Sequence, residues 1–250
     1  MKKTIISCVL FLTAVTAFSQ TPMKTAAEAK LSASDLAVKI ADRILATTTY
    51  EFKNTKTGKT YKSVKNLPLD MNVKVACKYN NWHYTNGVTH IALMELADKT
   101  GAKKYDDYVL KNMNFVFNEG NLDFFKKQYE QAMKNEGWYG VRKLSWHMIF
   151  RGKRLDDNGP MGASLIDLQM KHPNNSFLNY INETAEHLNY GEPRLADGTI
   201  ARIWPHENTI WADDAFMAIS FLARMAKMTG DMSYINDAAN QVIKYHKYLW

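Results

Sequence analysis

The stretch ISFLARMAKMTGDMSYINDAANQV, residues 219–242, describes two helices joined by a tight turn. Its first half is apolar at helical spacing, Thr229–Gly230 interrupts the pattern, and Tyr234 opens a second segment with an apolar stripe. Glycine readily adopts the left-handed backbone conformation that ends many helices. The stretch therefore predicts a helical hairpin.

The same pattern occurs earlier in the chain. Residues 90–113 read HIALMELADKTGAKKYDDYVLKNM, with Thr100–Gly101 at the turn and Tyr105 opening the second helix. A weaker copy is interrupted by Pro173–Asn175 and has Phe177 in place of the tyrosine. Three hairpins at uneven spacing predict an all-α architecture, either a solenoid or a closed α/α toroid. The long inserts between them favour the toroid, in which inserts at one end build a site.

The start of the chain has the features of a secretory signal peptide. Residues 5–18 are apolar, two lysines precede them, and small residues suit a cleavage after Ser19. We therefore expect residues 1–19 to direct export to the periplasm or the extracellular space. Residues 20–34 are polar and small and are predicted to form a tether, and residues 35–250 to form the helical domain.

Composition narrows the functional classes. The formal net charge is +7, and the lysines are scattered, which is typical of a solvated surface, although such a surplus also attracts anionic ligands. Export makes nucleic acid a poor candidate for that ligand. No stretch after the signal segment is apolar for long enough to cross a membrane. Only Cys77 remains once Cys8 is removed, so the exported chain has no intramolecular disulfide.

Two pairs of acidic residues occupy equivalent places in the repeat. With the hairpins aligned on their aromatic residues, Asp156–Asp157 and Asp213–Asp214 each mark the start of a first helix. Tyr84 falls at the same place in the first copy. If the first helices line the centre of a toroid, these side chains emerge at one end of it. Converging carboxylates can differ in protonation, which suits a proton donor beside a water-activating base. The alternative is that the aspartates only cap helices.

Residues suited to sugar binding surround the acids. Arg202 offers paired hydrogen bonds to a carboxylate, and Trp204 and Trp211 offer flat faces for a sugar ring. His206 lies between the two tryptophans, and Trp82–Tyr84 form a similar cluster in the first copy. For any one tryptophan alone, core packing is the simpler interpretation. Their position beside acids at helix starts favours a site.

Other chemistries find no support in the sequence. It contains no Gly-rich phosphate loop, no HExxH helix and no CxxC pair. The seven histidines are scattered, which argues against zinc. The residues therefore indicate neither a phosphate-binding loop nor a zinc site.

Three segments together resemble a known family. RLDDNGPMGASLIDL (residues 154–168) and RIWPHENTIWADDAFMAISFLARMAKMTGDMSY (residues 202–234) resemble the unsaturated glucuronyl and rhamnogalacturonyl hydrolases of glycoside hydrolase families 88 and 105. WHYTNGVTHIALMELADKTGAKKY (residues 82–105) resembles their opening helix. The resemblance covers most of residues 80–250, and TIWADDAFM is its most specific element.

The resemblance implies an (α/α)6 barrel and an unusual hydrolysis. An aspartate protonates C4 of the Δ4,5 double bond in a terminal uronic acid, and activated water adds at C5. The resulting hemiketal opens and releases the remaining oligosaccharide, preferably of pectin or rhamnogalacturonan type, without a cofactor. By motif, Asp213 is implied as the acid/base and Asp157 as the second aspartate. The implied substrate contacts are Tyr84, Arg202, His206 and Trp211.

Several alternatives stay open at this point. Each pair of adjacent aspartates leaves the identity of the catalytic residue undecided, between Asp156 and Asp157 and between Asp213 and Asp214. The chain stops at Trp250 within a helical pattern, and its hairpins are too few to close six, so we expect the N-terminal part of the barrel. Two other functions compete: a non-catalytic helical-repeat module that binds carbohydrate or protein, and an inverting α/α-barrel hydrolase of saturated glycans. The preferred uronide, its linkage and the oligomeric state are undecided.

Overall fold

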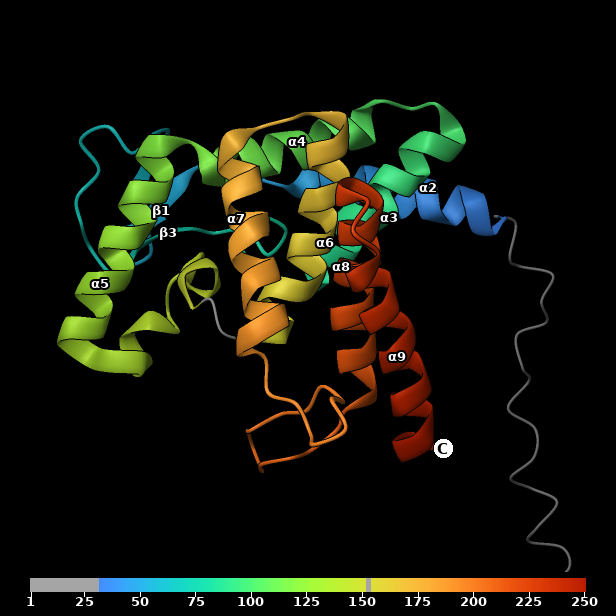
Figure 1. Cartoon of the computed structure of the whole chain (residues 1–250). Coiled ribbons are helices and arrows are strands. Elements are labelled where there is room, and N and C mark those ends of the chain that lie inside the picture. Colours follow the sequence, from blue (N-terminus) through green and yellow to red (C-terminus); the bar gives the residue numbers. More distant parts are fainter. Residues whose placement is uncertain (1–31, 152–153) are drawn as a thin grey trace, which may run out of the picture. The chain divides into compact units, whose positions relative to one another are not determined.

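The computed structural model describes residues 32–151 and 154–250 (Figure 1). The predicted signal peptide, residues 1–19, lies outside the described residues, as does most of the predicted tether. Contacts divide the chain into a first unit that ends at Ile40 and a second, Ala41–Trp250, with the boundary inside helix α2 (Ala33–Thr47). The second unit contains the small sheet, the helical hairpins and both aspartate pairs.

A small antiparallel sheet follows α2 in the second unit. Its strands β1 (Phe52–Asn54), β2 (Thr60–Tyr61) and β3 (Val73–Val75) lie in the order β2-β1-β3. Gly58, with φ of 76°, allows the turn between β1 and β2. The fully buried ring of Phe52 packs against aromatic rings of the following helices, at centroid distances of 5.7–5.9 Å. Aromatic packing therefore attaches the sheet to the helical part.

The helical hairpins predicted from the sequence are confirmed. Their helices are α3 (Tyr84–Thr100) with α4 (Lys104–Phe117), α6 (Leu155–Lys171) with α7 (Asn175–Glu186), and α8 (Ala212–Thr229) with α9 (Met232–Leu249). Gly101 and Gly230 end α3 and α8 in the left-handed conformation, with φ of 71° and 76°. Their backbone N–H groups bond back to the last turn, which satisfies carbonyls that the helix end leaves free.

Shorter and irregular elements connect these hairpins. Helix α5 (Glu119–Val141) follows α4 and contains a kink at Gly137, where the backbone leaves helical geometry. A 3₁₀ helix, η2 (His147–Phe150), precedes α6, and a π-helical turn, η3 (His187–Gly191), follows α7. The segment from η3 to α8 forms a loop with two isolated antiparallel bridges, visible in orange below α7 in Figure 1.

The first helices of the hairpins form an inner row. Helix α6 packs against both α3 and α8, while α4, α7 and α9 each pack against the first helix of their own hairpin. Within α6, every residue from Asp157 to Ile166 is buried, so this helix has no solvent-facing side over that stretch. The row is close-packed: a Cβ added at Gly159 would lie 2.4 Å from the backbone oxygen of Met217 in α8. This contact brings the starts of α6 and α8 together.

Among residues 32–151 and 154–250, no helix combines the length and apolar character needed to cross a membrane.

Candidate active site

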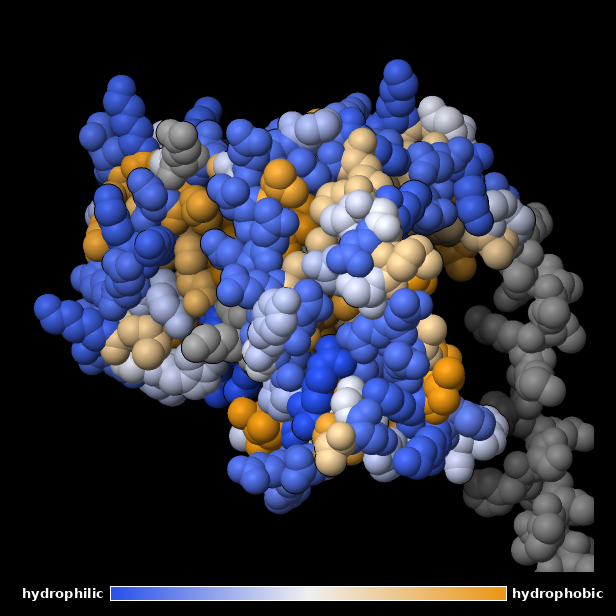
Figure 2. All heavy atoms as spheres, in the orientation of Figure 1, coloured by the Kyte–Doolittle hydropathy of each residue, from blue (hydrophilic) through white to orange (hydrophobic). Residues whose placement is uncertain are grey.

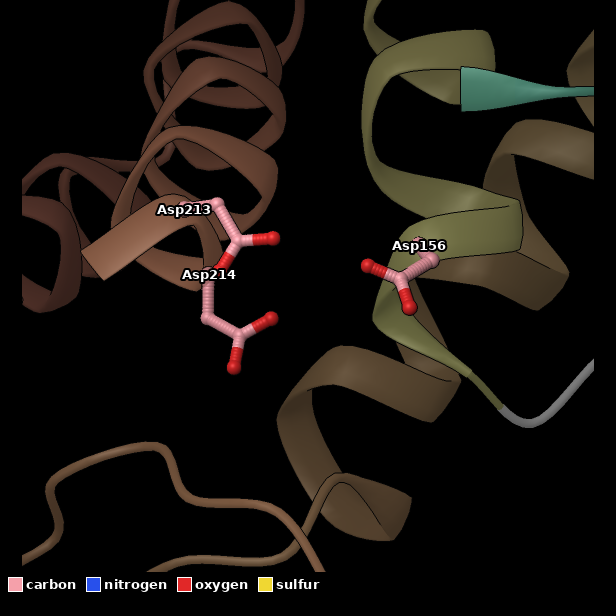
Figure 3. Close-up of side chains that lie close together, drawn as sticks. All are labelled: Asp156, Asp213 and Asp214. Carbon is pink, nitrogen blue, oxygen red and sulfur yellow. The ribbon is translucent and has the colours of Figure 1, made fainter. Parts of the chain in front are cut away.

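The starts of α6 and α8 bring three carboxylates together. Asp156 lies in the first turn of α6, and Asp213 and Asp214 lie in the first turn of α8. One oxygen from each of the three lies within 4.8 Å of the others (Figure 3). In Figure 3 the carboxylate of Asp156 faces those of Asp213 and Asp214 across the space between the two helices. We call these three residues the carboxylate cluster.

The alternative that these aspartates only cap helices is wrong. The N-cap of α6 is Arg154 and that of α8 is Trp211, and neither side chain makes a capping hydrogen bond. By contrast, the side chains of Asn174 and Asp231 do accept such bonds at the starts of α7 and α9. The acids of the cluster thus direct their oxygens toward other partners.

Arg202 holds the cluster together. Its Nε and Nη2 donate to the two carboxylate oxygens of Asp214 at 2.7 and 2.6 Å. Nη2 and Nη1 also donate to Asp156 at 2.9 and 3.2 Å, and Nη2 lies 3.7 Å from Asp213 Oδ2. Burial opposes the charge of this guanidinium, but the hydrogen bonds to Asp214 and Asp156 raise its pKa. One cation is therefore shared among three anions.

The backbone and an aromatic ring fix Arg202 in this position. Its N–H donates to the carbonyl of Thr209 at 2.8 Å, within an antiparallel bridge of the loop before α8. The guanidinium carbon lies 4.2 Å from the ring centroid of Trp211. Trp211 is 39% exposed, so one part of its surface stays open to a ligand.

The three acids differ in exposure. The side chain of Asp214 is 1% exposed, that of Asp156 is 27% exposed and that of Asp213 is 52% exposed. Burial raises the pKa of Asp214, and its hydrogen bonds from Arg202 act in the opposite direction. Asp214 is therefore enclosed in the protein interior, whereas Asp213 is the acid of the carboxylate cluster that is most accessible to a substrate.

Asp157, the predicted second aspartate, lies outside the cluster. Its side chain is 2% exposed, and its carboxylate accepts hydrogen bonds from Nε and Nη2 of Arg151. Burial raises the pKa of Asp157, and the bonds from Arg151 oppose that effect. The backbone carbonyl of Asp157 accepts a 2.8 Å bond from the indole of Trp82. The catalytic role of Asp157 stays a prediction, and the structure brings Asp156 to Asp213 instead.

Of the four predicted substrate contacts, Arg202 and Trp211 belong to the site. Tyr84 begins α3 and is 38% exposed, with its ring 4.5 Å from that of His83. His206 is exposed in the loop before α8, where its carbonyl accepts a hydrogen bond from Thr209. No hydrogen bond or ion pair among the described residues joins the side chain of Tyr84 or His206 to the aspartates.

The cavity at the cluster also contains residues that sequence reasoning missed. It is lined by Asp156, Asp214, Arg202 and the predicted sugar-binding Trp204, together with Arg154 and Glu192, to which the sequence assigned no role. Glu192 lies in the irregular segment after η3 and belongs to no recognisable motif, so no sequence signal indicated it. Its side chain is 7% exposed and lies 2.8 Å from Nε2 of His187. Burial, followed by repulsion from Asp214, raises the pKa of Glu192 to about 7.

Glu192 should make stability depend on pH. Its carboxyl ionises near pH 4.5 when unfolded and about 7 when folded, so folding becomes less favourable as pH rises through that window. A shift of this size corresponds to about 3 kcal/mol. We expect Glu192→Gln, which stays neutral, to gain stability over the wild type as the pH rises. Urea unfolding of both proteins at about pH 4.5 and about pH 8 measures the difference in unfolding free energy between the variant and the wild type. An equal difference at both pH values would contradict this prediction.

Fold and site together define a helical-barrel protein with an acidic site at the starts of its inner helices. A family model described as Glycosyl Hydrolase Family 88 matches residues 55–250. The chain belongs to Glycosyl Hydrolase Family 88, and the predicted family resemblance and fold class are confirmed. Comparison with curated proteins gives no match.

Two solved structures have a similar fold. Both are described as possible members of the GH105 family, one from Klebsiella pneumoniae and one from Salmonella enterica serovar Paratyphi A. Sequence identity is 13% and 14%, the TM-score is 0.51 for both, and 87% of this chain is covered in each case. The matched parts are 48% and 49% of those chains, so this chain spans about half their length.

Proposed function

We propose that the protein removes the Δ4,5-unsaturated uronic acid from the non-reducing end of oligosaccharides produced by polysaccharide lyases. Fragments of pectin or rhamnogalacturonan are the preferred substrates. The observation that carries the proposal is the exposed carboxylate of Asp213, 3.7 Å from the shared Arg202 and facing Asp156. Membership of a glycoside hydrolase family supports the general class of reaction.

The different exposures of the three acids support a different role for each of them. Asp213, the most exposed, donates a proton to C4 of the double bond, and water adds to the cationic C5. The proton lost by that water returns to Asp213, either directly or by way of Asp156, so the acid is regenerated. The C5 hydroxyl product is a hemiketal, which opens and releases the next sugar. Buried Asp214 holds Arg202, which in turn orients the other two carboxylates.

Surrounding groups support an anionic sugar as the ligand. Trp211 and Trp204 are 39% and 61% exposed beside the cluster, and exposed indole rings suit contact with a sugar ring. We also propose that the protein acts outside the cytoplasm, as its N-terminal sequence predicts, where oligosaccharides from extracellular lyases arise.

The test uses the ultraviolet absorbance of the conjugated double bond, which hydration destroys. We expect the native protein to lower this absorbance when mixed with lyase-digested pectin, and to release a saturated remainder visible by mass spectrometry. A binding module would bind the digest without any change in absorbance. An inverting hydrolase of saturated glycans would instead produce new reducing ends from undigested polysaccharide. Constant absorbance with pectin, rhamnogalacturonan and glycosaminoglycan digests alike would exclude the proposal.

A further inference from the structure

We propose that Arg154, together with Trp204, binds the carboxylate of the terminal sugar and selects acidic over neutral substrates. Arg154 immediately precedes α6, and both residues line the cavity that contains Asp156 and Asp214. The inference deepens the proposed function and rests on it, because it concerns recognition of the same sugar unit.

One of the two arginines that line the cavity is available to bind an anion. Three acidic side chains line it, those of Asp156, Glu192 and Asp214, beside the arginines Arg154 and Arg202. Arg202 is occupied by its bonds to the carboxylate cluster. Within the described part of the chain, Arg154 makes no ion pair or hydrogen bond through its side chain, and it is exposed to solvent. Its guanidinium can therefore bind an anion from solution.

An uronic acid needs such a cation to approach the site. Its carboxylate is negative, and the aspartates that it must approach repel it. Arg202 offsets part of that repulsion, but its N–H groups already point at Asp214 and Asp156. Arg154 supplies a second positive charge on the cavity lining, where a carboxylate and an Arg fork make paired hydrogen bonds.

Trp204 orients that guanidinium without occupying its hydrogen-bond donors. The guanidinium carbon of Arg154 lies 5.7 Å from the ring centroid of Trp204. Contact through the ring face leaves the five N–H groups, which lie in the guanidinium plane, free for a ligand. Trp204 is 61% exposed, in a loop whose surface mixes polar and apolar residues at the bottom of Figure 2. The free guanidinium donors of Arg154, beside the exposed indole ring of Trp204, are therefore suited to the carboxylate and the ring of an acidic sugar.

The comparison of an acid with its ester tests this inference. The probes are an unsaturated galacturonyl disaccharide and its methyl ester, with kcat and KM measured for the wild type and for Arg154→Gln. We expect the wild type to prefer the acid, and the variant to lose that preference by about tenfold or more, mainly through a higher KM for the acid. Arg154→Lys keeps the charge but not the fork, so it should give an intermediate preference. Arg43→Gln removes an exposed arginine on α2 and should leave both constants unchanged.

A binding measurement separates failure of the inference from failure of the proposed function. Calorimetry compares saturated galacturonate oligosaccharides with their methyl esters, using the wild type and Arg154→Gln. Tighter binding of the acid that disappears in the variant would support carboxylate recognition even without turnover. An unchanged acid-to-ester ratio in Arg154→Gln, in either kinetics or binding, would overturn the role of Arg154. If the wild type acts on no unsaturated uronide, the proposed reaction is overturned, but the role of Arg154 in carboxylate binding is not.

Discussion

Replacing Asp213 with asparagine should lower turnover of unsaturated uronides by about 10²–10⁴-fold, the usual contribution of a positioned acid or base. The side chain is 52% exposed, and among residues 32–151 and 154–250 its one ion pair is the 3.7 Å contact with Arg202, so folding should hardly change. Initial rates of absorbance loss give the effect on turnover. Thermal unfolding of the same samples shows whether the variant is as stable as the wild type.

Asp231→Asn is the matched control for this substitution. Asp231 caps α9 by accepting a 2.8 Å bond from the N–H of Ser233, and asparagine caps helices equally well. This variant should keep both rate and stability. Wild-type rates in Asp213→Asn would show that another group donates the proton.

The same assay decides between the adjacent acids of α6. If Asp156 acts opposite Asp213, Asp156→Asn should lose turnover while remaining stable, because its side chain is 27% exposed. Asp157→Asn should instead lose stability, since it breaks a buried ion pair with Arg151. Loss of turnover in Asp157→Asn with unchanged thermal unfolding would restore Asp157 to the catalytic role implied by the family motif.

Arg202→Met should destabilise the protein by about 3–5 kcal/mol at neutral pH, the usual cost of removing one partner of a buried ion pair. The variant leaves Asp214, with a side chain 1% exposed, without its charged donor. It also removes the cation between Asp156 and Asp213, whose negative charges then repel each other. Urea unfolding at neutral pH measures this loss.

The loss in Arg202→Met should shrink in acid. Burial already raises the pKa of Asp214 while Arg202 opposes that effect, so removing Arg202 raises it further. A carboxyl that holds its proton more tightly when folded makes folding less favourable as pH rises. The difference between variant and wild type should therefore be smaller at about pH 5 than at about pH 8.

Lys104→Met provides the comparison for a surface ion pair. Lys104 pairs with Asp42 at 2.5 Å, but the two side chains are 51% and 45% exposed. Water solvates each charge when its partner is removed, so stability should change little at either pH. If Arg202→Met behaved like Lys104→Met, the carboxylate cluster would not depend on its shared cation.

The proposed site could be predicted in outline but not in detail. The repeat alignment correctly brought the starts of α6 and α8 together, and the stretch just before Asp213 indicated Arg202 and Trp211 beside the acids. Glu192 was not indicated because it belongs to no repeated position or motif of known chemistry, and Arg154 begins the segment 154–168 without a role that the sequence assigned to it. Glu192 becomes part of the cavity only through the path of the loop after η3.

The sequence alone determined the hairpins and the positions of the acidic pairs, because these depend on local features. Helical spacing defines the helices, and Gly101 and Gly230 end two of them through a conformation that glycine adopts readily. Tertiary structure decided which acid of the first pair faces the second pair. Adjacent residues on an α-helix point about 100° apart, so Asp156 and Asp157 cannot share a direction. Packing of α6 buries Asp157 against Arg151 and leaves Asp156 facing Asp213 across the site.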